Sequence, residues 1–437
     1  GKVGFCMEKT DSRYGAYLAI LNEELIPAMG CTEPIAIALA AARARDLAGG
    51  LPDRMELEVS GSIVKNAKSV VVPHTGGLKG IEAAAAAGAV AGDADAWLEV
   101  IASVDENAIA QIEAYLSSTP IIVRRAESDL DFDLTVHAFR HEGEREHSGT
   151  VRIAEYHTNI VCEQCDGLVL HEVPLAEIGE TAEGLTDRSL LNMEAIWDFA
   201  MTVDIDDVRD VIGRQIACNW AVSQEGLAGD WGANIGNVLR LAYGDDVKVR
   251  ACACAAAGSD ARMSGCELPV VINSGSGNQG MTTSLPVIEY AKELNASDEK
   301  LYRALCLSNL TTIHQKTSIG RLSAFCGAVS AGAGAGAGIA YLLGSDLDGI
   351  SHTVANAIAT TGGIVCDGAK ASCASKIATA VEAGILGYNM HIQDQDFQPD
   401  DGLVGDTPED TISNIGRLGK EGMKSTNEEI IKIMVGN

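Results

Sequence analysis

Residues 322–344 read LSAFCGAVSAGAGAGAGIAYLLG. This stretch carries no charged side chain and is long enough to span a bilayer. Its centre alternates alanine with glycine rather than using leucine or phenylalanine, which weakens membrane insertion. Small residues instead let neighbouring backbones approach closely. We therefore predict a buried helix whose small residues form its contacts with other helices, and no membrane partner.

The composition supports a packed protein with an acidic surface. Of the 437 residues, 46% are hydrophobic but only 4% are aromatic, so aliphatic side chains must build the core and wholesale disorder is excluded. The 61 acidic residues outnumber the 32 basic ones, which gives a net charge of −29. Such a surface repels nucleic-acid phosphates and anionic membranes, so we expect a small-molecule or protein partner and no nucleic acid.

The pattern of apolar residues predicts an α+β fold with a mostly helical C-terminal half and a smaller α+β module in the N-terminal half. The predicted domains are 1–95 (helices, a strand and a His-Thr-Gly-Gly loop packed on the C-terminal domain), 96–185 (the α+β module) and 186–437 (the helical domain). The expected N-terminal strands are 55–64, 98–103, 120–125, 132–140 and 149–157. The expected N-terminal helices are 14–49, broken at 27–34, then 80–91 and 106–116. The expected C-terminal helices are 189–203, 206–225, 229–243, 246–258, 280–293, 298–313, 321–343, 346–360, 371–386 and 407–435.

Cysteine is the most informative residue type. The segment Gly1–Lys9 lacks the apolar core of a signal peptide, so we expect a cytoplasmic protein without a disulfide framework. Many of the cysteines should then be buried as small hydrophobic residues. The twelve are Cys6, Cys31, Cys162, Cys165, Cys218, Cys252, Cys254, Cys266, Cys306, Cys326, Cys366 and Cys373.

Three of these cysteines lie where a loop is expected to become a helix. Cys31 comes just before Thr32-Glu33-Pro34, where the helix dipole would favour its thiolate, although a buried cysteine in a turn is an alternative. Cys366 and Cys373 are seven residues apart, which fits no standard zinc or ferredoxin spacing, so a structural pair is as good an interpretation as a metal site.

Cys326 begins the Ala/Gly helix and extends this pattern. If Cys326, Cys366 and Cys373 converge, they form a three-thiolate site, and three thiolates can bind a [4Fe–4S] cluster that keeps one iron open. An open iron is a Lewis acid that can bind substrate.

Two glycine-rich loops could hold an anion. Residues 273–280 (NSGSGNQG) present backbone N–H groups together with Ser276 and Asn278, and His74-Thr75-Gly76 forms a smaller loop of the same kind. A tight structural turn is the alternative for each.

For the remaining cysteines, histidines and acidic loop, we expect structural or surface positions rather than functional ones. Cys162 and Cys165 lack a partner pair for zinc, and Cys252 and Cys254 suit core packing. Solvated positions are expected for His137, His141, His147, His157 and the loop 394–410.

Three segments together resemble the L-cysteine desulfidase family, which is related to the iron–sulfur-dependent L-serine dehydratases. They are ELIPAMGCTEP (24–34), GSGNQG (275–280) and CDGAKASC (366–373), and the similarity covers roughly residues 14–435. The resemblance implies a pyridoxal-free carbon–sulfur lyase that converts L-cysteine to pyruvate, ammonia and sulfide with a [4Fe–4S] cluster. By position, it assigns Cys326, Cys366 and Cys373 as cluster ligands and Cys31 as the proton acceptor.

Alternatives remain at this point. An L-serine ammonia-lyase could use the same cluster, a non-catalytic iron–sulfur redox sensor would need no proton acceptor, and a purely structural protein would bind no iron. The two glycine-rich loops are candidates for the substrate carboxylate. A homodimer is the default expectation for an enzyme of this size.

Overall fold

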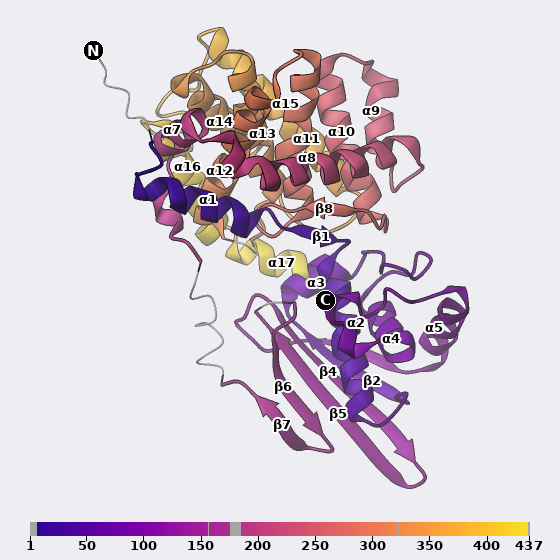
Figure 1. The fold of residues 1–437 in the computed structure, drawn as a ribbon. Helices are drawn as coiled ribbons and strands as arrows, with labels where there is room; N and C mark the ends of the chain where they lie inside the picture. The colour runs from indigo at the N-terminus through magenta and orange to yellow at the C-terminus, as the bar shows by residue number, and fades with distance from the viewer. Residues whose placement is uncertain (1–6, 156, 175–184, 321–322, 436–437) are drawn as a thin grey trace.

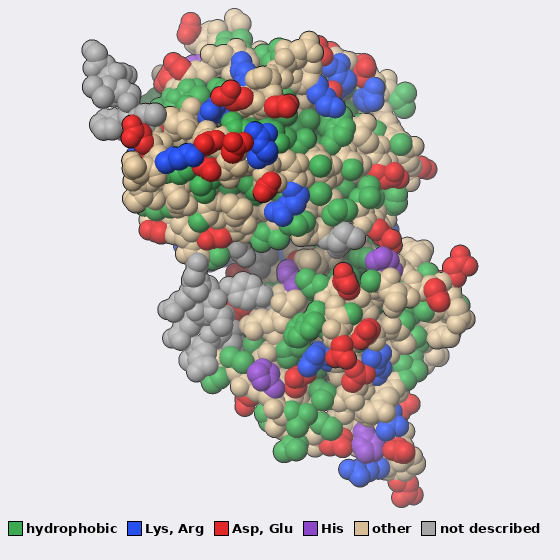
Figure 2. Space-filling model, in the orientation of Figure 1, with side chains coloured by type: hydrophobic (Ala, Val, Ile, Leu, Met, Phe, Trp, Pro, Cys, Tyr) green, Lys and Arg blue, Asp and Glu red, His purple; other side chains and the backbone are tan. Residues whose placement is uncertain are grey.

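The computed structural model describes residues 7–155, 157–174, 185–320 and 323–435. Helices build one part of the molecule, and a six-stranded sheet with flanking helices builds the other (Figure 1). The outline narrows where the two parts meet (Figure 2). This arrangement agrees with the predicted α+β class and its mostly helical C-terminal half.

The helical part combines the start of the chain with nearly all of its C-terminal half. Its helices are α1 (Ser12–Glu24), α7 (Met193–Thr202), α8 (Ile205–Ala228), α9 (Ile235–Tyr243), α10 (Val247–Met263), α11 (Gly277–Glu293), α12 (Asp298–Ile319), α13 (Gly327–Leu342), α14 (Leu347–Thr361), α15 (Cys373–Ile392), α16 (Pro408–Arg417) and α17 (Lys424–Val435), with short turns η3 (Arg188–Leu190) and η4 (Leu418–Gly422). Strands β1 (Pro27–Met29) and β8 (Pro269–Val271) pair antiparallel beside them.

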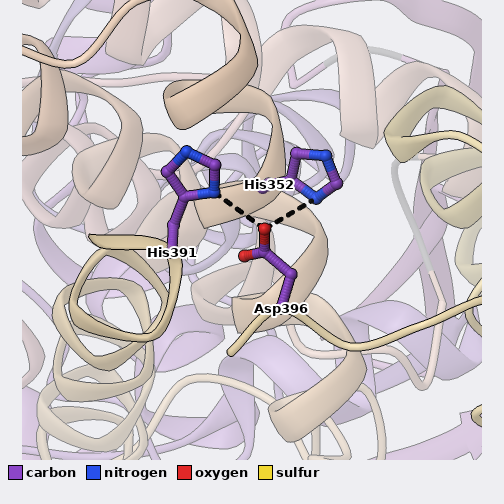
Figure 3. A group of neighbouring side chains, drawn as sticks. All are labelled: His352, His391 and Asp396. Carbon is purple, nitrogen blue, oxygen red and sulfur yellow. Dashed lines mark hydrogen bonds and ion pairs between the residues drawn. The ribbon is translucent and has the colours of Figure 1, made fainter. Parts of the chain in front are cut away.

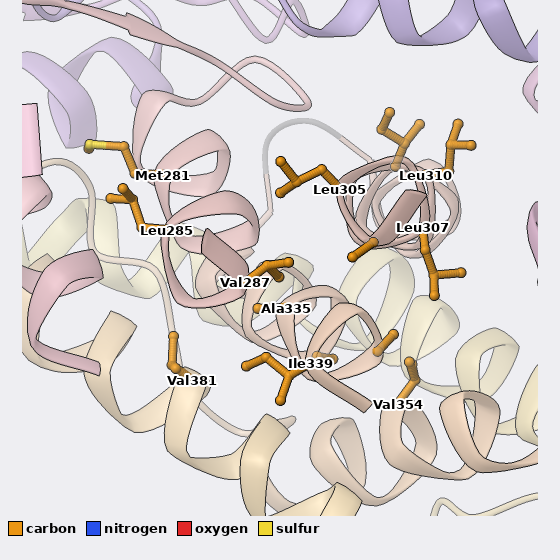
Figure 4. Packing of buried hydrophobic residues seen from close by; sticks show 14 of the residues in the cluster. Met281, Leu285, Val287, Leu305, Leu307, Leu310, Ala335, Ile339, Val354 and Val381 are labelled. Carbon is orange, nitrogen blue, oxygen red and sulfur yellow. The ribbon is translucent and has the colours of Figure 1, made fainter. Parts of the chain in front are cut away.

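Helix α13 lies at the centre of this part and packs against α11, α12, α14 and α15 (Figure 4). Its glycines permit the close contacts: a Cβ at Gly332 would lie 2.5 Å from the backbone of Ala380 on α15. Apart from Gly327 and Tyr341, every residue of α13 is buried, which confirms the predicted buried helix. Among the described residues, no helix is both long and apolar enough to cross a membrane.

The α+β part has the strand order β3-β2-β4-β5-β6-β7. Its pairs are antiparallel except for β2 with β3, and α2 packs against β4 and β5. Its elements are α2 (Thr32–Leu47), β2 (Arg54–Val59), α3 (Gly61–Ala67), α4 (Ile81–Ala91), η1 (Ala94–Glu99), α5 (Glu106–Ser118), β3 (Ile121–Arg125), β4 (Asp133–Glu142), β5 (Arg145–Ala154), β6 (Ile160–Cys165) and β7 (Leu168–Glu172).

Several predicted elements differ from the observed ones. The strand predicted over 55–64 stops at Val59, because the apolar pair Ile63–Val64 belongs to one buried face of α3 rather than to a continued alternation. The strand predicted over 98–103 is absent: Trp97 takes a positive φ of 52°, which kinks the chain inside η1, and a turn follows from Val100. Strands β6 and β7 were not predicted.

The sheet also joins residues from both sides of position 95, where a domain boundary was expected. Strand β2 lies between β3 and β4, and the hydrophobic core under the sheet combines α2 and α4 with β4 and β5. Helix α1 belongs instead to the core of the helical part, through Tyr17, Ile20 and Leu21.

Helix α17 connects the two parts. The Asn427 side chain accepts a hydrogen bond from Lys65 on α3 (2.8 Å), and Glu428 pairs with Arg125 on β3 (2.8 Å). The C-terminal helix thus holds α3 against the helical part beside the cavity described next.

Candidate active site

A cavity of about 260 Å³ lies between the two parts of the molecule. The α+β part contributes the starts of α2 and α3 and the loop after β5, and the helical part contributes the starts of α11, α13 and α15. Cys31, Cys326, Cys366 and Cys373 all line this cavity. The structure therefore brings together four cysteines that are far apart in the sequence.

Two of these cysteines are held side by side by a short piece of backbone pairing. Phe325 and Val365 form an isolated antiparallel bridge. The N–H of Cys326 donates to the Ile364 carbonyl (3.1 Å), and the N–H of Cys366 donates to the Ala324 carbonyl (2.6 Å). The pairing fixes both backbones at the cavity edge.

Cys373 is the first residue of α15, and its thiol donates to the Gly368 carbonyl (3.4 Å). Gly368 has a φ of +91°, and a Cβ there would lie 1.7 Å from the Lys65 carbonyl oxygen on α3. Only glycine fits this close approach. The loop carrying Cys366 is thereby pressed against the α+β part.

The donor set at this end of the cavity fits a thiolate-bound metal group. Cys326, Cys366 and Cys373 are free thiols, one buried and two half-buried. Burial, with the neighbouring Cys366, raises the pKa of the Cys326 thiol to about 12. Such thiols stay protonated until a metal displaces the proton. The buried side chains of Lys65 and Lys316 line the same cavity. Burial lowers the pKa of both amines, and in their ammonium form they would offset the charge of bound thiolates.

Cys31 lies at the N-cap of α2, as predicted, but its thiol has an acidic neighbour. The thiol donates to Oε2 of Glu33 (3.0 Å), and Nε2 of His157 lies 3.6 Å from Oε1 of the same carboxylate. The His157 ring packs against Phe132, with centroids 4.7 Å apart. Cys31, Glu33 and His157 form a chain of groups that we call the thiol–carboxylate–imidazole chain.

The surroundings of Cys31 oppose the expected thiolate in the resting site. Burial, followed by the negative charge of Glu33, raises the pKa of the Cys31 thiol well above its ordinary value. Burial also opposes ionisation of Glu33, but the His157 imidazole and the Cys31 thiol outweigh it and lower the pKa of Glu33 to about 2. The helix dipole is a smaller effect than these two, so the resting pair is a thiol and a carboxylate.

Three residues that line the cavity each have a polar side-chain atom without a hydrogen-bond partner among the residues that the structure describes. Nε of Arg262, Oδ1 of Asn278 and Oε1 of Gln279 are all buried without a hydrogen bond. A buried polar atom of this kind costs free energy unless a ligand or water satisfies it. The three atoms therefore offer one cationic donor and two carbonyl acceptors to a small polar molecule.

The structure separates the two predicted anion loops. Ser276 and Asn278 line the cavity, and Ser276 caps α11 by accepting from the N–H of Gln279 (3.3 Å). His74, Thr75 and Gly76 do not line it. The Thr75 hydroxyl donates to the Val72 carbonyl (2.6 Å). Nδ1 of His74 lies 3.1 Å from Oε1 of Glu267, in a small separate pocket that Cys31 also lines.

The structure also places the cysteines and histidines for which the sequence favoured a structural or surface role. Cys252 and Cys254 are buried in the helical core, as expected. The Cys165 thiol donates to the Leu47 carbonyl (3.2 Å) rather than facing a metal site. His137, His141 and His147 lie beside surface carboxylates, whereas His157, expected in a solvated position, faces the cavity.

Sequence reasoning missed Glu33, His157 and Arg262 as site residues. Glu33 stood inside the quoted GCTEP motif but was interpreted only as a residue near the helix cap. The other two carry no local motif, because their role depends on contacts across more than a hundred residues of chain.

The fold and the cavity are those of a protein with a small-molecule site between its two parts. Four thiols, the Glu33 carboxylate and the basic side chains of Lys65, Lys316 and Arg262 line this site. A family model described as the serine dehydratase alpha chain matches residues 95–432. A UPF0597 protein of Desulfitobacterium hafniense is 56% identical over 98% of each chain. A UPF0597 protein of Lachnoclostridium phytofermentans is 49% identical over 97% of this chain and 100% of its own, and one of Finegoldia magna is 46% identical over 96% and 99%.

The chain belongs to the serine dehydratase alpha chain family. Membership implies an iron–sulfur lyase of the serine dehydratase type rather than a pyridoxal phosphate enzyme.

Proposed function

We propose that the protein catalyses the pyridoxal-free β-elimination of L-cysteine, giving pyruvate, ammonia and sulfide. One observation carries the proposal: the three thiols of Cys326, Cys366 and Cys373 line the same cavity as the thiol of Cys31. A redox sensor or a structural protein would need no fourth thiol, paired with a carboxylate, at that place.

Cys326, Cys366 and Cys373 would hold a [4Fe–4S] cluster. When bound, such a cluster supplies an open iron, a Lewis acid that stabilises negative charge developing on the substrate and suits a sulfur leaving group. The side chains of this protein must then bind the amino acid, orient it and move its protons.

Binding of the amino acid falls to the unpartnered polar atoms. The guanidinium of Arg262 and the ammonium of Lys316 offer positive charge to the α-carboxylate. The carbonyl oxygens of Asn278 and Gln279 accept hydrogen bonds from the α-ammonium. A zwitterionic head group carries both the anionic acceptor and the cationic donor that these atoms would pair with, whereas a simple carboxylate carries only the acceptor.

Cys31 accepts the α-proton. Its thiol is protonated in the resting site, so the proton must first leave. The Glu33 carboxylate, 3.0 Å away, would relay it outward, because its low pKa keeps it from retaining the proton. Nε2 of His157 lies 3.6 Å from the other oxygen of that carboxylate, at ion-pair distance for a protonated imidazole. A substrate ammonium entering the cavity partly offsets the charge of Glu33, which eases formation of the thiolate.

Elimination breaks the Cα–H and Cβ–S bonds and releases sulfide and aminoacrylate. Aminoacrylate tautomerises to an imine, and water hydrolyses the imine to pyruvate and ammonia without further need of the protein. The overall reaction consumes one water and needs no oxidant or reductant.

L-Serine is the second candidate substrate. It is favoured by the match to the serine dehydratase alpha chain family, and the same residues would bind its head group. The difference lies in the leaving group, because a hydroxide needs more help from a Lewis acid or a proton donor than a soft sulfide does.

The test is anaerobic reconstitution with iron and sulfide, followed by parallel assays of pyruvate from L-cysteine and from L-serine. The proposal expects pyruvate and sulfide in equal amounts from L-cysteine, at a higher kcat/KM than for L-serine. Cys31→Ser should retain the iron and lose turnover. If reconstituted protein turned over neither amino acid, or if Cys31→Ser kept full activity, the assignment would be overturned.

A further inference from the structure

A second cluster of metal-ligating side chains lies far from the cavity. His352 on α14, His391 in the last turn of α15 and Asp396 in the following loop point toward one another (Figure 3). Nδ1 of His391 lies 2.8 Å from Oδ2 of Asp396, and Nδ1 of His352 lies 3.5 Å from the same oxygen. The two imidazole rings stack with centroids 5.4 Å apart and planes 10° apart.

One potential ligand atom from each residue lies within 4.8 Å of the other two. A tetrahedral zinc ion with bonds of about 2.0–2.2 Å places its nitrogen and oxygen ligands roughly 3.3 Å apart. Because the two ring planes are nearly parallel, at least one half-buried imidazole must rotate for both nitrogens to reach one ion at that spacing.

The surroundings of the three residues match the support that metal ligands need. Asp348 lies on the far side of both rings, 3.5 Å from Nε2 of His352 and 3.9 Å from Nε2 of His391. A carboxylate in this position fixes the tautomer and orientation of a ligating histidine. Asn356 donates to Oδ1 of Asp396 (2.8 Å), which leaves Oδ2 facing the rings.

Two electrostatic features also favour a cation here. His391 lies at the C-terminal end of α15, where the helix dipole is negative. The chain as a whole carries a net charge of −29. Without a cation, both imidazoles compete for the same carboxylate oxygen.

We propose that His352, His391 and Asp396 bind one divalent transition-metal ion of the zinc class, with Asp348 as the outer-shell partner of both histidines. Two imidazoles and a carboxylate suit such an ion better than calcium or magnesium, which prefer oxygen ligands throughout. The ion would link α14, α15 and the loop 393–407. It would therefore stabilise the packing of α14 against α15 at the C-terminal end of α15.

This site is distinct from the cavity of the proposed lyase. Cys373 and His391 lie at opposite ends of α15, and 18 helical residues at 1.5 Å each separate them by about 27 Å. The proposal therefore does not depend on the lyase reaction.

The experiment uses protein carrying its reconstituted iron–sulfur cluster, so that the cysteines of the cavity are occupied. Zinc is titrated against a chelating dye, and bound zinc is counted after desalting. We expect one zinc ion per chain, about 100-fold weaker binding in His391→Ala and in His352→Ala, and about 10-fold weaker binding in Asp348→Ala. His141→Ala is the matched control, because His141 lies between Asp53 and Glu146 and belongs to no candidate metal cluster among the described residues, so zinc binding should stay unchanged.

Cobalt(II) supplies a second readout. A site of imidazoles and carboxylate gives visible cobalt bands without the intense near-ultraviolet charge transfer of thiolate ligands. Zinc should also raise the melting temperature of the wild type but not of Asp396→Asn, which keeps the shape of the side chain and removes its charge. Equal zinc affinity in wild type and His391→Ala, or a thiolate-type cobalt spectrum, would overturn the proposal. The absence of any zinc binding by the wild type would overturn it as well.

Discussion

The thiol of Cys31 donates to a carboxylate oxygen of Glu33 at 3.0 Å, in a cavity where Cys31 is buried and Glu33 is half-buried. Burial, followed by the negative charge of Glu33, raises the pKa of the thiol and keeps the proton on the sulfur, and yet the same carboxylate is the nearest group that can receive it. A base held in its protonated form beside its own proton acceptor is consistent with a site that becomes active when substrate enters.

Glu33→Gln tests that relationship directly. The amide keeps the size of the side chain but cannot accept the thiol proton as a carboxylate does, so we expect kcat to fall about 100-fold or more while the iron content stays unchanged. Glu58→Gln is the matched control, because Glu58 also faces a histidine, His137, but on the sheet surface. Full activity in Glu33→Gln would remove the carboxylate from the proton route.

The raised pKa of Cys31 predicts how activity depends on pH. The thiol must lose its proton to act, so kcat/KM should rise with pH through the neutral and mildly alkaline range in which the cluster is retained. Alkylation of Cys31, followed by mass spectrometry of its peptide, should start at lower pH in Glu33→Gln, because removing the negative charge lowers the pKa of the thiol. An unchanged alkylation profile would show that Glu33 does not control this thiol.

Cys366→Ala should lose most of the iron and the visible absorption of the reconstituted cluster. Cys366 faces the cavity beside Cys326, and two remaining thiols cannot hold a cluster that needs three. Cys218→Ala, a half-buried cysteine on α8 outside the cavity, should keep the iron. Equal iron in both variants would contradict the assigned ligand set.

Arg262→Lys should raise KM for the amino acid about 10-fold, with a smaller change in kcat. The lysine keeps the charge but loses the planar fork whose Nε is unpartnered in the cavity, and a hydrogen bond to a charged group contributes roughly 1.5–3 kcal/mol. Arg250→Lys is the control on the same helix, α10, because Arg250 pairs with Glu289 and Glu293 away from the cavity. A KM unchanged in Arg262→Lys would exclude Arg262 from carboxylate binding.

Gly332→Ala should destabilise the helical part by about 2 kcal/mol or more. The added Cβ would lie 2.5 Å from the Ala380 backbone, so α13 and α15 would have to separate. Gly363→Ala is the control, because a Cβ there meets nothing within 4 Å. Thermal unfolding followed by circular dichroism compares the two, and equal melting temperatures would contradict the close helix contact.

The local pattern of residues was sufficient to predict most helices and the buried character of α13. It failed at Val59 and Trp97, where the decision between strand and helix or turn depends on which neighbour the apolar face meets. It also missed β6 and β7, whose alternation is weak because β7 is exposed along its whole length. In each case the tertiary partner, rather than the local sequence, determines the structure.

In the cavity, too, the local sequence predicted some features and the tertiary contacts determined the others. The motifs around Cys31, Cys366 and Cys373 marked these thiols as reactive candidates, because loop-to-helix junctions are recognisable locally. The sequence could not show that Glu33 suppresses the thiolate at Cys31, because burial and the His157 contact arise only in the folded chain.

By itself, the sequence determined the mixed helix-and-sheet class of the fold and the buried Ala/Gly helix, and it singled out a few cysteines as candidates. The fold class and the buried helix follow from residue size and periodicity along the chain. Only the tertiary structure decided which thiols share a cavity, which charges surround them and where His352 meets His391. Protonation and ligand geometry depend on distances through space, and the chain sets those distances only when it packs.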